Sequence, residues 1–447
     1  MNDTLIKIIE AHKSGQSVGI CAVCSSNRYV LEAAMRQAWA DDTDLLIEST
    51  SNQVDQFSGY SGMTPRDFFA YVSGICEKMN FPFERVILGG DHLGPNVWQN
   101  QPAEQAMNCA RDQIKAYIEA GYIKIHLDTS MSLADDPGDE YSALTTETIA
   151  ERAADLCAVS EKAAEKNTNK PLYVIGTEVP IPGGAQEELA EQTPTSVDDL
   201  EETIEVTKKA FYSRNLQEAY ERVIAIVVQP GVEFDDSHVI EYDREKARHL
   251  SQFIEKYDYL VYEAHSTDYQ RKEKLKELVE DHFAILKVGP ALTFAFREAV
   301  FALAQMEQEY LAAKLGEAKS NIISVIEKLM LKNQKYWQKH YHGDDAALYF
   351  ARKYSFSDRI RYYWPDPEID GALKKLISNL KGNPVPLSLL SQYLPNQYWA
   401  VRDGEIRNDP EDLIHHKIGE ILRDYAYATI PPDNEQAVLK AAVRDDF

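Results

Sequence analysis

Residues 223–229 read VIAIVVQ, a run of branched apolar side chains that ends on a polar one. A run without polar residues at alternate positions is typical of a strand that is covered on both faces of its sheet. Seven further runs of this kind occur before residue 290. They begin at Val18, Leu45, Val86, Tyr122, Leu172, Tyr259 and Ala284, and read VGICAVCS, LLIEST, VILGGDH, YIKIHLDTS, LYVIGTE, YLVYEAH and AILKVG.

Stretches with helical periodicity separate these runs, for example near residues 103–120 and 146–166. Buried strands that alternate with helices predict a parallel sheet. Eight such units in succession predict a (β/α)8 TIM barrel, an α/β fold. An open, doubly wound sheet is the alternative architecture, but no glycine-rich dinucleotide fingerprint follows the first run, which weakens that alternative.

The strand-like runs stop after residue 293, and helical patterns replace them. Two apolar stripes at helical spacing mark this part of the chain: Val300, Leu303, Met306 and Tyr310, and then Ile414, Ile418, Ile421, Leu422 and Tyr425. Asp409 and Pro410 are the residue types of a helix N-cap and first position, so they predict where the second of these helices begins. We expect a barrel domain over 1–295, a helical extension over 296–430 and a loosely packed tail over 431–447.

The acidic balance of the chain limits its partners. Its 447 residues include 47 Lys and Arg against 72 Asp and Glu, a formal net charge of −25. Nucleic acid and anionic membrane surfaces attract basic proteins, so neither is an expected partner. A phosphorylated small molecule is still compatible with this charge, because a few local cations and helix N-termini suffice to bind phosphate.

The sequence also indicates a cytoplasmic protein. The N-terminal residues lack the basic leader and long apolar core of a signal peptide, and no run approaches about 18 apolar residues. An odd number of cysteines in a long chain argues against a disulfide framework and fits a reducing compartment. Cys21 and Cys24 have the spacing of a redox or metal pair, but no second pair follows, and we interpret them as strand residues.

Polar residues close most of the eight predicted strands. In a TIM barrel the active site forms at the carboxyl ends of the strands, so these side chains are expected to meet at one mouth. Packing alone does not explain polar residues at so many strand ends. They are Glu48, Asp91 with His92, Asp128, Glu178, Gln229 and His265.

His92 and His265 are the leading candidates for metal ligands, because neutral imidazole binds Zn and related divalent ions. Glu178 ends a strand between them and is expected to be a third ligand or to support one from behind. Asp91 adjoins His92 and would face the same mouth, where its carboxylate can act as a general acid or base. The alternative for either histidine alone is a hydrogen-bonded core residue.

The last two strand ends predict a phosphate site. Phosphate commonly lies beyond strands 7 and 8 of a TIM barrel, where the loops here read HSTDYQ and VGPALT. We therefore expect Ser266, Thr267, Gly289 and Thr293 to bind a phosphate group, although such small residues also serve ordinary turns.

Two further candidates for substrate contact lie outside these loops. Glu48 ends the second predicted strand. The segment SDRIRYYWP, residues 357–365, has Arg359 and Arg361 among aromatic side chains. This segment is either a structural helix end or a lid that brings an arginine, with Arg359 as the candidate, to the substrate.

Nine sequence motifs, spread over most of the chain, can be compared with known families. They are GICAVCSSN, LIESTSNQVDQFSGYSGMTPRDF, ILGGDHLGPNVWQ, KIHLDTSMS, YVIGTEVPIPGG, IAIVVQPGVEF, VYEAHSTDYQ, AILKVGPALTFAFREA and SDRIRYYWP. They resemble the Z-type subunit of D-tagatose-1,6-bisphosphate aldolase (GatZ/KbaZ), a family related to class II aldolases. The resemblance runs from about residue 5 to residue 427.

This resemblance implies a TIM barrel that acts on a ketohexose phosphate or bisphosphate in tagatose, galactitol or N-acetylgalactosamine catabolism. It implies a heteromer with a separate catalytic class II aldolase subunit, which the Z subunit stabilises and activates. Some relatives are described instead as ketohexose-phosphate 4-epimerases that act alone. The resemblance also implies a divalent metal cofactor, Zn, Mn, Co or Ni. Barrels of this kind often pair, so we expect a homo-oligomer.

The class II aldolase pattern implies a role for particular residues of this chain. Its catalytic and metal-binding positions are similar to Asp91 with His92, Asp128, Glu178 with Gly183 and Gly184, and His265. On this resemblance Asp91, Asp128 and Glu178 are catalytic.

One position departs from that pattern. A second metal histidine should end the sixth strand, where Gln229 stands. Glutamine is a neutral oxygen ligand and matches Zn less well than imidazole does. The metal site is therefore either remodelled around Glu178 or Gln229, or weakened.

Three functional hypotheses follow. With a metal at His92, His265 and Glu178, the chain is an aldolase-type enzyme or 4-epimerase in which Asp91 takes the proton of the 4-hydroxyl group. With a weakened metal site, it is an accessory partner of a catalytic aldolase. The third hypothesis is a module that binds sugar phosphates without turnover.

Overall fold

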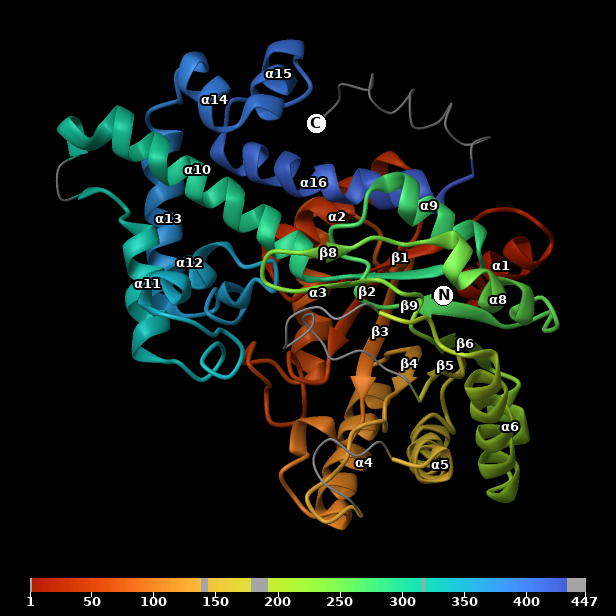
Figure 1. The fold of residues 1–447 in the computed structure, drawn as a ribbon. Helices are drawn as coiled ribbons and strands as arrows, with labels where there is room; N and C mark the ends of the chain where they lie inside the picture. Colours follow the sequence, from red (N-terminus) through yellow and green to blue (C-terminus); the bar gives the residue numbers. More distant parts are fainter. Residues whose placement is uncertain (1, 138–143, 178–191, 316–317, 432–447) are drawn as a thin grey trace.

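Eight parallel strands of the computed structural model form a closed barrel in the order β1-β2-β3-β4-β5-β6-β9-β10 (Figure 1). The structure describes residues 2–137, 144–177, 192–315 and 318–431. The barrel strands are β1 (Ile20–Cys24), β2 (Leu45–Thr50), β3 (Val86–Leu93), β4 (Lys124–Leu127), β5 (Leu172–Ile175), β6 (Val223–Val227), β9 (Val261–Ala264) and β10 (Ile285–Val288). Each of the eight runs in the sequence supplies one strand, so the predicted TIM barrel is confirmed.

The barrel interior is apolar at the amino-terminal ends of the strands. Side chains from every wall meet there in one buried cluster, which includes Ile20, Leu46, Ile87, Ile123, Leu172, Ile224, Val261 and Ile285. Helix α1 (Asn2–Lys13) packs Leu5 and Ile9 against this cluster. Burial of this kind supplies most of the stability of a fold. The opposite end of the interior is charged, and the candidate site lies there.

Helices surround the barrel. They are α2 (Arg28–Ala40), α3 (Pro65–Met79), α4 (Ala103–Glu119), α5 (Thr146–Ala163), α6 (Val197–Ser213), α7 (Gln217–Tyr220), α8 (Arg244–Ile254) and α9 (Lys272–Glu280). Local sequence signals set their starts. Thr64 and Asp67 form a capping box before α3, and the Asn27 side chain caps α2.

Shorter elements connect these helices to the strands. The 3-10 turns η1 (Phe83–Arg85) and η2 (Pro95–Trp98) flank β3. A two-stranded hairpin, β7 (Glu233–Phe234) with β8 (Val239–Ile240), follows β6. This hairpin lies on the carboxyl side of the strands, because it directly follows the carboxyl end of β6.

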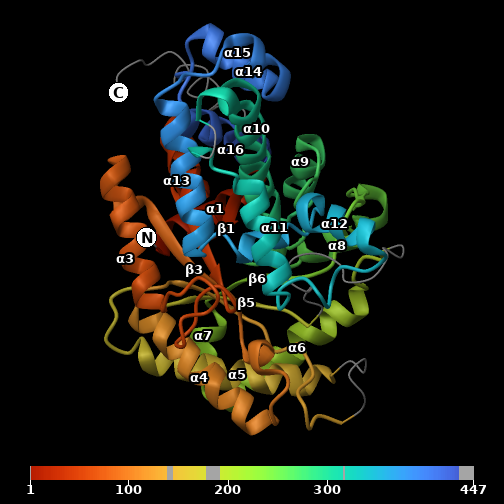
Figure 2. The ribbon, with the colours of Figure 1, turned by 90° about the vertical axis from the view of Figure 1, so that its left-hand side faces the viewer.

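The remaining helices form the predicted extension. They are α10 (Pro290–Leu315), α11 (Ile322–Lys332), α12 (Asp345–Tyr354), α13 (Pro367–Lys381), α14 (Leu387–Tyr393), α15 (Pro395–Asp403) and α16 (Pro410–Thr429), with the 3-10 turn η4 (Arg359–Tyr362) before α13. Figures 1 and 2 show α10, α13 and α16 on the opposite side of the barrel from α4 and α5. Helix α16 packs against α2, α9 and α10.

The extension shares its core with the barrel. One hydrophobic cluster contains residues of both, and Tyr29 of α2 stacks on Phe296 of α10 with ring centroids 5.1 Å apart. The predicted boundary at residue 295 falls inside α10, which leads from the barrel into the extension without a break. The division into barrel, extension and tail stays a prediction, and residues 432–447 of the tail lie outside the described residues.

The predicted start of the last helix is confirmed. The Asp409 side chain accepts a hydrogen bond from the backbone N of Glu411 at 2.9 Å, and Pro410 is the first residue of α16. In the predicted stripe of α10, Val300, Leu303 and Met306 are buried, whereas Tyr310 is exposed. All five cysteines have free thiols. None of the helices in the described ranges is long and apolar enough to cross a membrane.

Candidate metal centre and active site

Asp91 and His92 end β3, where the backbone is irregular. The register of β3 against β4 shifts between Gly90 and Leu93. His92 has a φ of 50°, in the left-handed region that residues other than glycine rarely adopt. Adjacent side chains of a regular strand point to opposite faces, but this irregularity lets both Asp91 and His92 face the barrel mouth.

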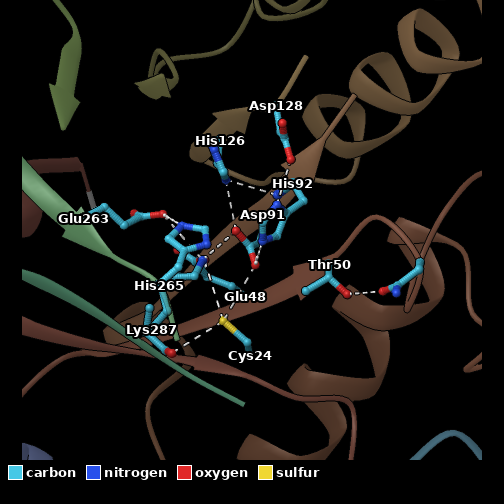
Figure 3. A network of polar contacts seen from close by, with 12 residues as sticks. Cys24, Glu48, Thr50, Asp91, His92, His126, Asp128, Glu263, His265 and Lys287 are labelled. Carbon is cyan, nitrogen blue, oxygen red and sulfur yellow. Dashed lines mark hydrogen bonds and ion pairs between the residues drawn. The ribbon is translucent and has the colours of Figure 1, made fainter. Parts of the chain in front are cut away.

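Three buried histidines from three strands lie against one another (Figure 3). His92 belongs to β3, His126 to β4, and His265 directly follows β9. The ring centroids are 4.8 Å apart for His92 and His265, 5.1 Å for His92 and His126, and 5.2 Å for His126 and His265. Two of the three are the histidines that the sequence predicted. The third, His126, is an additional member.

Each histidine is paired with a carboxylate. The pairs and distances are His92 Nδ1 to Asp128 Oδ2, 2.8 Å; His126 Nδ1 to Asp91 Oδ1, 3.1 Å; and His265 Nε2 to Glu263 Oε1, 2.9 Å. A carboxylate partner fixes the orientation and tautomer of an imidazole and leaves its other nitrogen for a metal ion or a proton. Of the three, His126 and His265 offer a nitrogen to the group that could hold a metal, and Nδ1 of His126 also accepts a hydrogen bond from the backbone N of His92 at 3.2 Å.

Burial and these pairings have opposite effects on the pKa values. Burial alone would lower the pKa of His92, but the carboxylates of Asp91 and Asp128 outweigh it and raise the pKa to about 9. Burial would raise the pKa of Asp128, yet the hydrogen bond with His92 lowers it to about 2. The pKa of Asp91 is likewise held below its usual range, against burial, by His92 and His126. Asp91 is therefore a carboxylate at neutral pH.

Two lysines share the barrel interior with the histidines. Lys124 Nζ lies 2.6 Å from Glu48 Oε1 and 2.6 Å from Glu263 Oε2. Lys287 Nζ contacts Glu48 Oε2 and lies 2.8 Å from Asp91 Oδ1. All five side chains are almost fully buried. The ionic network thus joins β2, β3, β4, β9 and β10 across the interior.

A glycine makes room for this network. Glu48 of β2 is the register partner of Gly89 in β3. A Cβ atom at Gly89 would lie 2.8 Å from Cγ of Glu48, closer than side-chain atoms pack. The Glu48 carboxylate can reach the lysines because this neighbour has no side chain.

The donor set fits a divalent metal ion. Asp91, His126, Glu263 and His265 each offer one ligand atom, and these atoms lie within 4.8 Å of one another. Within the described part of the chain, Nε2 of His126 is buried without a hydrogen-bond partner. Buried polar atoms are almost always paired, so this nitrogen is available to a ligand. Mixed imidazole and carboxylate donors suit Zn and similar divalent ions.

The charge of the network also favours a cation. Four buried carboxylates accompany two buried ammonium groups: Glu48, Asp91, Asp128 and Glu263 with Lys124 and Lys287. With all histidines neutral the network has a net charge of minus two, and with His92 protonated, as its raised pKa implies at neutral pH, the net charge is minus one. Buried charge is costly unless it is balanced. A divalent cation would balance it fully, and protonated histidines are the alternative.

A cavity of about 520 Å³ opens at this end of the barrel. Its lining includes Asp91, His92, His265 and Lys287, whereas His126 and Glu263 are not lining residues. Small-molecule sites commonly have volumes of roughly 300–1,000 Å³, so the cavity is large enough for a sugar phosphate.

Three of the four predicted phosphate residues line the cavity: Ser266, Gly289 and Thr293. Thr267 does not, and its hydroxyl donates to the backbone oxygen of Lys287 at 2.5 Å. Glu48, the other predicted substrate contact, belongs to the buried ionic network instead of the cavity wall.

A carboxylate occupies the helix N-terminus beyond the eighth strand. Oδ1 of Asp268 accepts hydrogen bonds from the backbone N atoms of Gly289, at 3.0 Å, and Ala291, at 2.8 Å. Burial raises the pKa of Asp268 to about 6, against the effect of these two bonds. The N–H groups that would bind phosphate in a typical barrel are therefore already paired.

Of the two other predicted metal ligands, Gln229 lies in the described part of the chain and Glu178 does not. Oε1 of Gln229 accepts hydrogen bonds from the backbone N atoms of Gly231, at 2.8 Å, and Val232, at 3.0 Å, so this oxygen shapes the loop after β6. Glu178, with the nearby Gly183 and Gly184, lies outside the described residues.

In the segment SDRIRYYWP, Arg361 lines the cavity and Arg359 does not. Arg359 is buried and donates from Nη1 to the backbone oxygen of Tyr336 at 3.0 Å. The turn of η4 therefore presents the second arginine of this segment to the cavity, and not the predicted Arg359.

Several residues of the site had no signal at a strand end: Lys124, His126, Glu263 and Lys287. Lys124, His126 and Asp128 alternate along one strand, as do Glu263 and His265. Alternate residues of a strand point to the same face. A period-two pattern of polar residues within an apolar run is the signal that could have identified Lys124, His126 and Glu263, whereas Lys287 has no such pattern.

Comparison with known proteins agrees with this architecture. Residues 5–430 match the family described as D-tagatose-1,6-bisphosphate aldolase subunit GatZ/KbaZ-like. A crystal structure of a probable tagatose 6 phosphate kinase from Sinorhizobium meliloti is 43% identical, with a TM-score of 0.83 over 92% of this chain and 100% of that chain. A fructose-bisphosphate aldolase from Campylobacter jejuni is 13% identical over 84% of this chain and 91% of that chain, with a TM-score of 0.43, which supports no statement about activity.

Proposed function

Because this chain belongs to the D-tagatose-1,6-bisphosphate aldolase subunit GatZ/KbaZ-like family, we propose that it acts on a ketohexose phosphate through a divalent metal at the histidine cluster. The reaction is retro-aldol cleavage of the C3–C4 bond, followed by release or by re-addition that yields the 4-epimer. The observation that supports this proposal is a buried cluster of histidines and carboxylates, of which Asp91, His92 and His265 line a cavity of about 520 Å³.

His126, His265 and Glu263 would hold the metal, with Asp91 and His92 beside them. The metal ion, when bound, supplies Lewis acidity toward the carbonyl and hydroxyl oxygens of the ketose. Asp128 would orient the His92 ring through its hydrogen bond of 2.8 Å. The lysines Lys124 and Lys287 hold the carboxylates in place.

Asp91 is the proposed general base. Its lowered pKa keeps it ionised, and it lines the cavity. Its carboxylate takes the proton of the 4-hydroxyl group, the C3–C4 bond breaks, and the electron pair of that bond stays with C3 as an enediolate. C4 becomes an aldehyde carbon. Re-addition to the other aldehyde face forms the bond again, and Asp91 returns its proton to the new alkoxide, so the epimerisation needs no co-reactant.

The first test is conversion of D-fructose 6-phosphate by the purified chain, followed by carbon NMR with added Mn or Zn and with a chelator. We expect the tagatose isomer or triose products to appear only with metal. Asp91→Asn should lower the rate by about 10²–10⁴-fold, as loss of a general base does. Asp155→Asn, which changes a partly exposed carboxylate paired with Arg111 on the outside of the barrel, is the matched control. Unchanged turnover in Asp91→Asn would disprove this role.

The description of the family as an aldolase subunit supports a second candidate function, an accessory partner of a catalytic class II aldolase subunit. This function predicts no conversion by the chain alone and a stable complex with that subunit. Size-exclusion chromatography of the mixture at micromolar concentration tests it. Separate elution of the two proteins would rule it out.

A further inference from the structure

Arg361 brings a positive charge to the cavity without a carboxylate partner. It lies in η4 and lines the cavity with Tyr60 and Tyr362. Its Nη1 donates to the backbone oxygens of Ser357 and Asp358. Among the described residues, no carboxylate oxygen lies within 4.0 Å of its guanidinium nitrogens. The carboxylates of Asp268 and Asp358 act on it only at longer range, so an anionic ligand in direct contact would stabilise it further.

The guanidinium of Arg361 is held in place before any ligand arrives. Nη2 donates to the hydroxyl of Tyr362 at 2.9 Å, and the guanidinium lies 4.4 Å from the centroid of that ring. Tyr60 of the loop after β2 contacts Tyr362 edge-on, with centroids 4.6 Å apart. A planar guanidinium with a fixed orientation is suited to two parallel hydrogen bonds with a phosphate.

Arg361 interacts with the buried carboxylates of Asp268 and Asp358 at longer range than an ion pair, and it also acts on its uncharged neighbours. Burial would raise the pKa of Tyr362, but Arg361 and Arg359 outweigh it and lower that pKa. Burial lowers the pKa of His340 to about 4, and the same two arginines add to this effect. An anion would be attracted to this part of the cavity.

The other cationic side chains of the cavity wall already have partners. Arg28 Nε lies 2.7 Å from Glu32, and Lys374 Nζ lies 2.6 Å from Asp370. Lys287 belongs to the ionic network with Glu48 and Asp91. Asp268 occupies the backbone N–H groups at the start of α10. Among the cationic side chains that the described part of the chain places on this wall, Arg361 is thus the one still available to an anionic ligand.

We propose that Arg361 binds the phosphate group of the substrate, so that the helical extension supplies the phosphate site of this barrel. The loops after β9 and β10 would then line the sugar, not the phosphate. This inference rests on the proposed function, because it takes the ligand to be a sugar phosphate.

The test compares binding of inorganic phosphate, D-fructose 6-phosphate and unphosphorylated D-fructose by isothermal titration calorimetry on the full chain. Arg361→Gln should weaken binding of both phosphate compounds by about tenfold or more, as loss of a charge-assisted bidentate contact does, and leave fructose binding unchanged. Lys374→Gln removes the same charge from the same wall and is the matched control. It should change phosphate affinity by less than about twofold, because Lys374 is exposed and already paired.

A second measurement covers the case in which Arg361→Gln does not fold, as circular dichroism would reveal. In the unaltered protein, inorganic phosphate should protect Arg361 from modification by phenylglyoxal, with the modified residue located by mass spectrometry. Equal modification with and without phosphate would overturn the inference. So would equal phosphate affinity in Arg361→Gln and the wild-type chain.

The two proposals fail in different ways. Arg361-dependent phosphate binding without turnover would support this phosphate site and count against the enzymatic function. Turnover with unchanged phosphate affinity in Arg361→Gln would support the function and overturn this phosphate site.

Discussion

Gly89 shows how much of the site depends on the absence of a side chain. The Glu48 carboxylate reaches Lys124 and Lys287 by passing over the backbone of Gly89, with no Cβ atom in the way. Any larger residue would push Glu48 out of this ionic network. The two lysines would then keep their charges with one carboxylate fewer, which is costly in a buried place.

Gly89→Ala should therefore destabilise the protein by about 1–3 kcal/mol, the usual cost of overpacking. The measurement is the free energy of unfolding from urea denaturation. Gly74→Ala is the matched control, because a Cβ atom at Gly74 of α3 would meet nothing within 4 Å. Alanine in an exposed helix should be neutral or should stabilise by up to about 1 kcal/mol. Equal stability of Gly89→Ala and wild type would contradict the steric argument.

At the scale of elements, one buried carboxylate joins three helices. Glu32 of α2 is 1% exposed. It lies 2.7 Å from Arg28 Nε of the same helix, 2.8 Å from Lys78 Nζ of α3, and 2.9 Å from His415 Nε2 of α16. The last helix of the extension is thereby tied to the helices beside the first two strands.

This contact predicts a pH dependence of stability. Burial would raise the pKa of Glu32, but its hydrogen bonds with His415, Lys78 and Arg28 lower it from 4.5 to about 2. Because the folded pKa is the lower one, the stabilisation is complete above the unfolded value and is lost as the pH falls from 4.5 toward 2. It amounts to about 3 kcal/mol at neutral pH.

Glu32→Gln should remove that stabilisation at pH 7 and flatten the acid limb of the curve of unfolding free energy against pH. Chemical denaturation at a series of pH values measures both effects. Glu151→Gln, which alters an exposed pair with Arg214, is the control and should change little. An acid limb of unchanged steepness in Glu32→Gln would show that other groups cause it.

The sequence predicts most of the elements but fewer of the residues that form the site. The eight strands were predictable because short continuous apolar runs between helices are typical of parallel strands buried on both faces. The start of α16 was predictable because Asp409 and Pro410 are the residue types of a helix N-cap and first position. The third histidine of the cluster, His126, was not predicted, because it lies within an apolar run and not at its end. The choice of Arg361 over Arg359 depends on the exact turn of η4, which residue types do not encode.

At the scale of the whole molecule, the candidate ligands come from separate walls of the barrel. Asp91 belongs to β3, His126 to β4, and Glu263 and His265 to β9 or its end. A metal ion there would hold these walls together and offset the excess negative charge of the buried carboxylates. Metal loading should therefore affect the stability of the entire barrel.

Removing metal with a chelator should lower the melting temperature, and added Mn or Zn should restore it. A ligand at about 100 times its dissociation constant stabilises the folded state by about 2.7 kcal/mol. Differential scanning calorimetry measures the shift, and His126→Ala is the comparison, because its melting temperature should respond much less to metal. The same shift in both proteins would place the metal elsewhere.

The closure of the barrel has a consequence for how the chain emerges from the ribosome. The first strand, β1, pairs with β10 from Ile20 to Ile285, so its partner is made 265 residues later. At about 5–20 residues per second, that interval lasts roughly 13–53 seconds. During this time the outer edge of β1 has no partner strand, and such an edge invites contact with other chains. Translation speed and chaperone supply should therefore influence the yield of this protein more than the stability of its finished barrel would suggest.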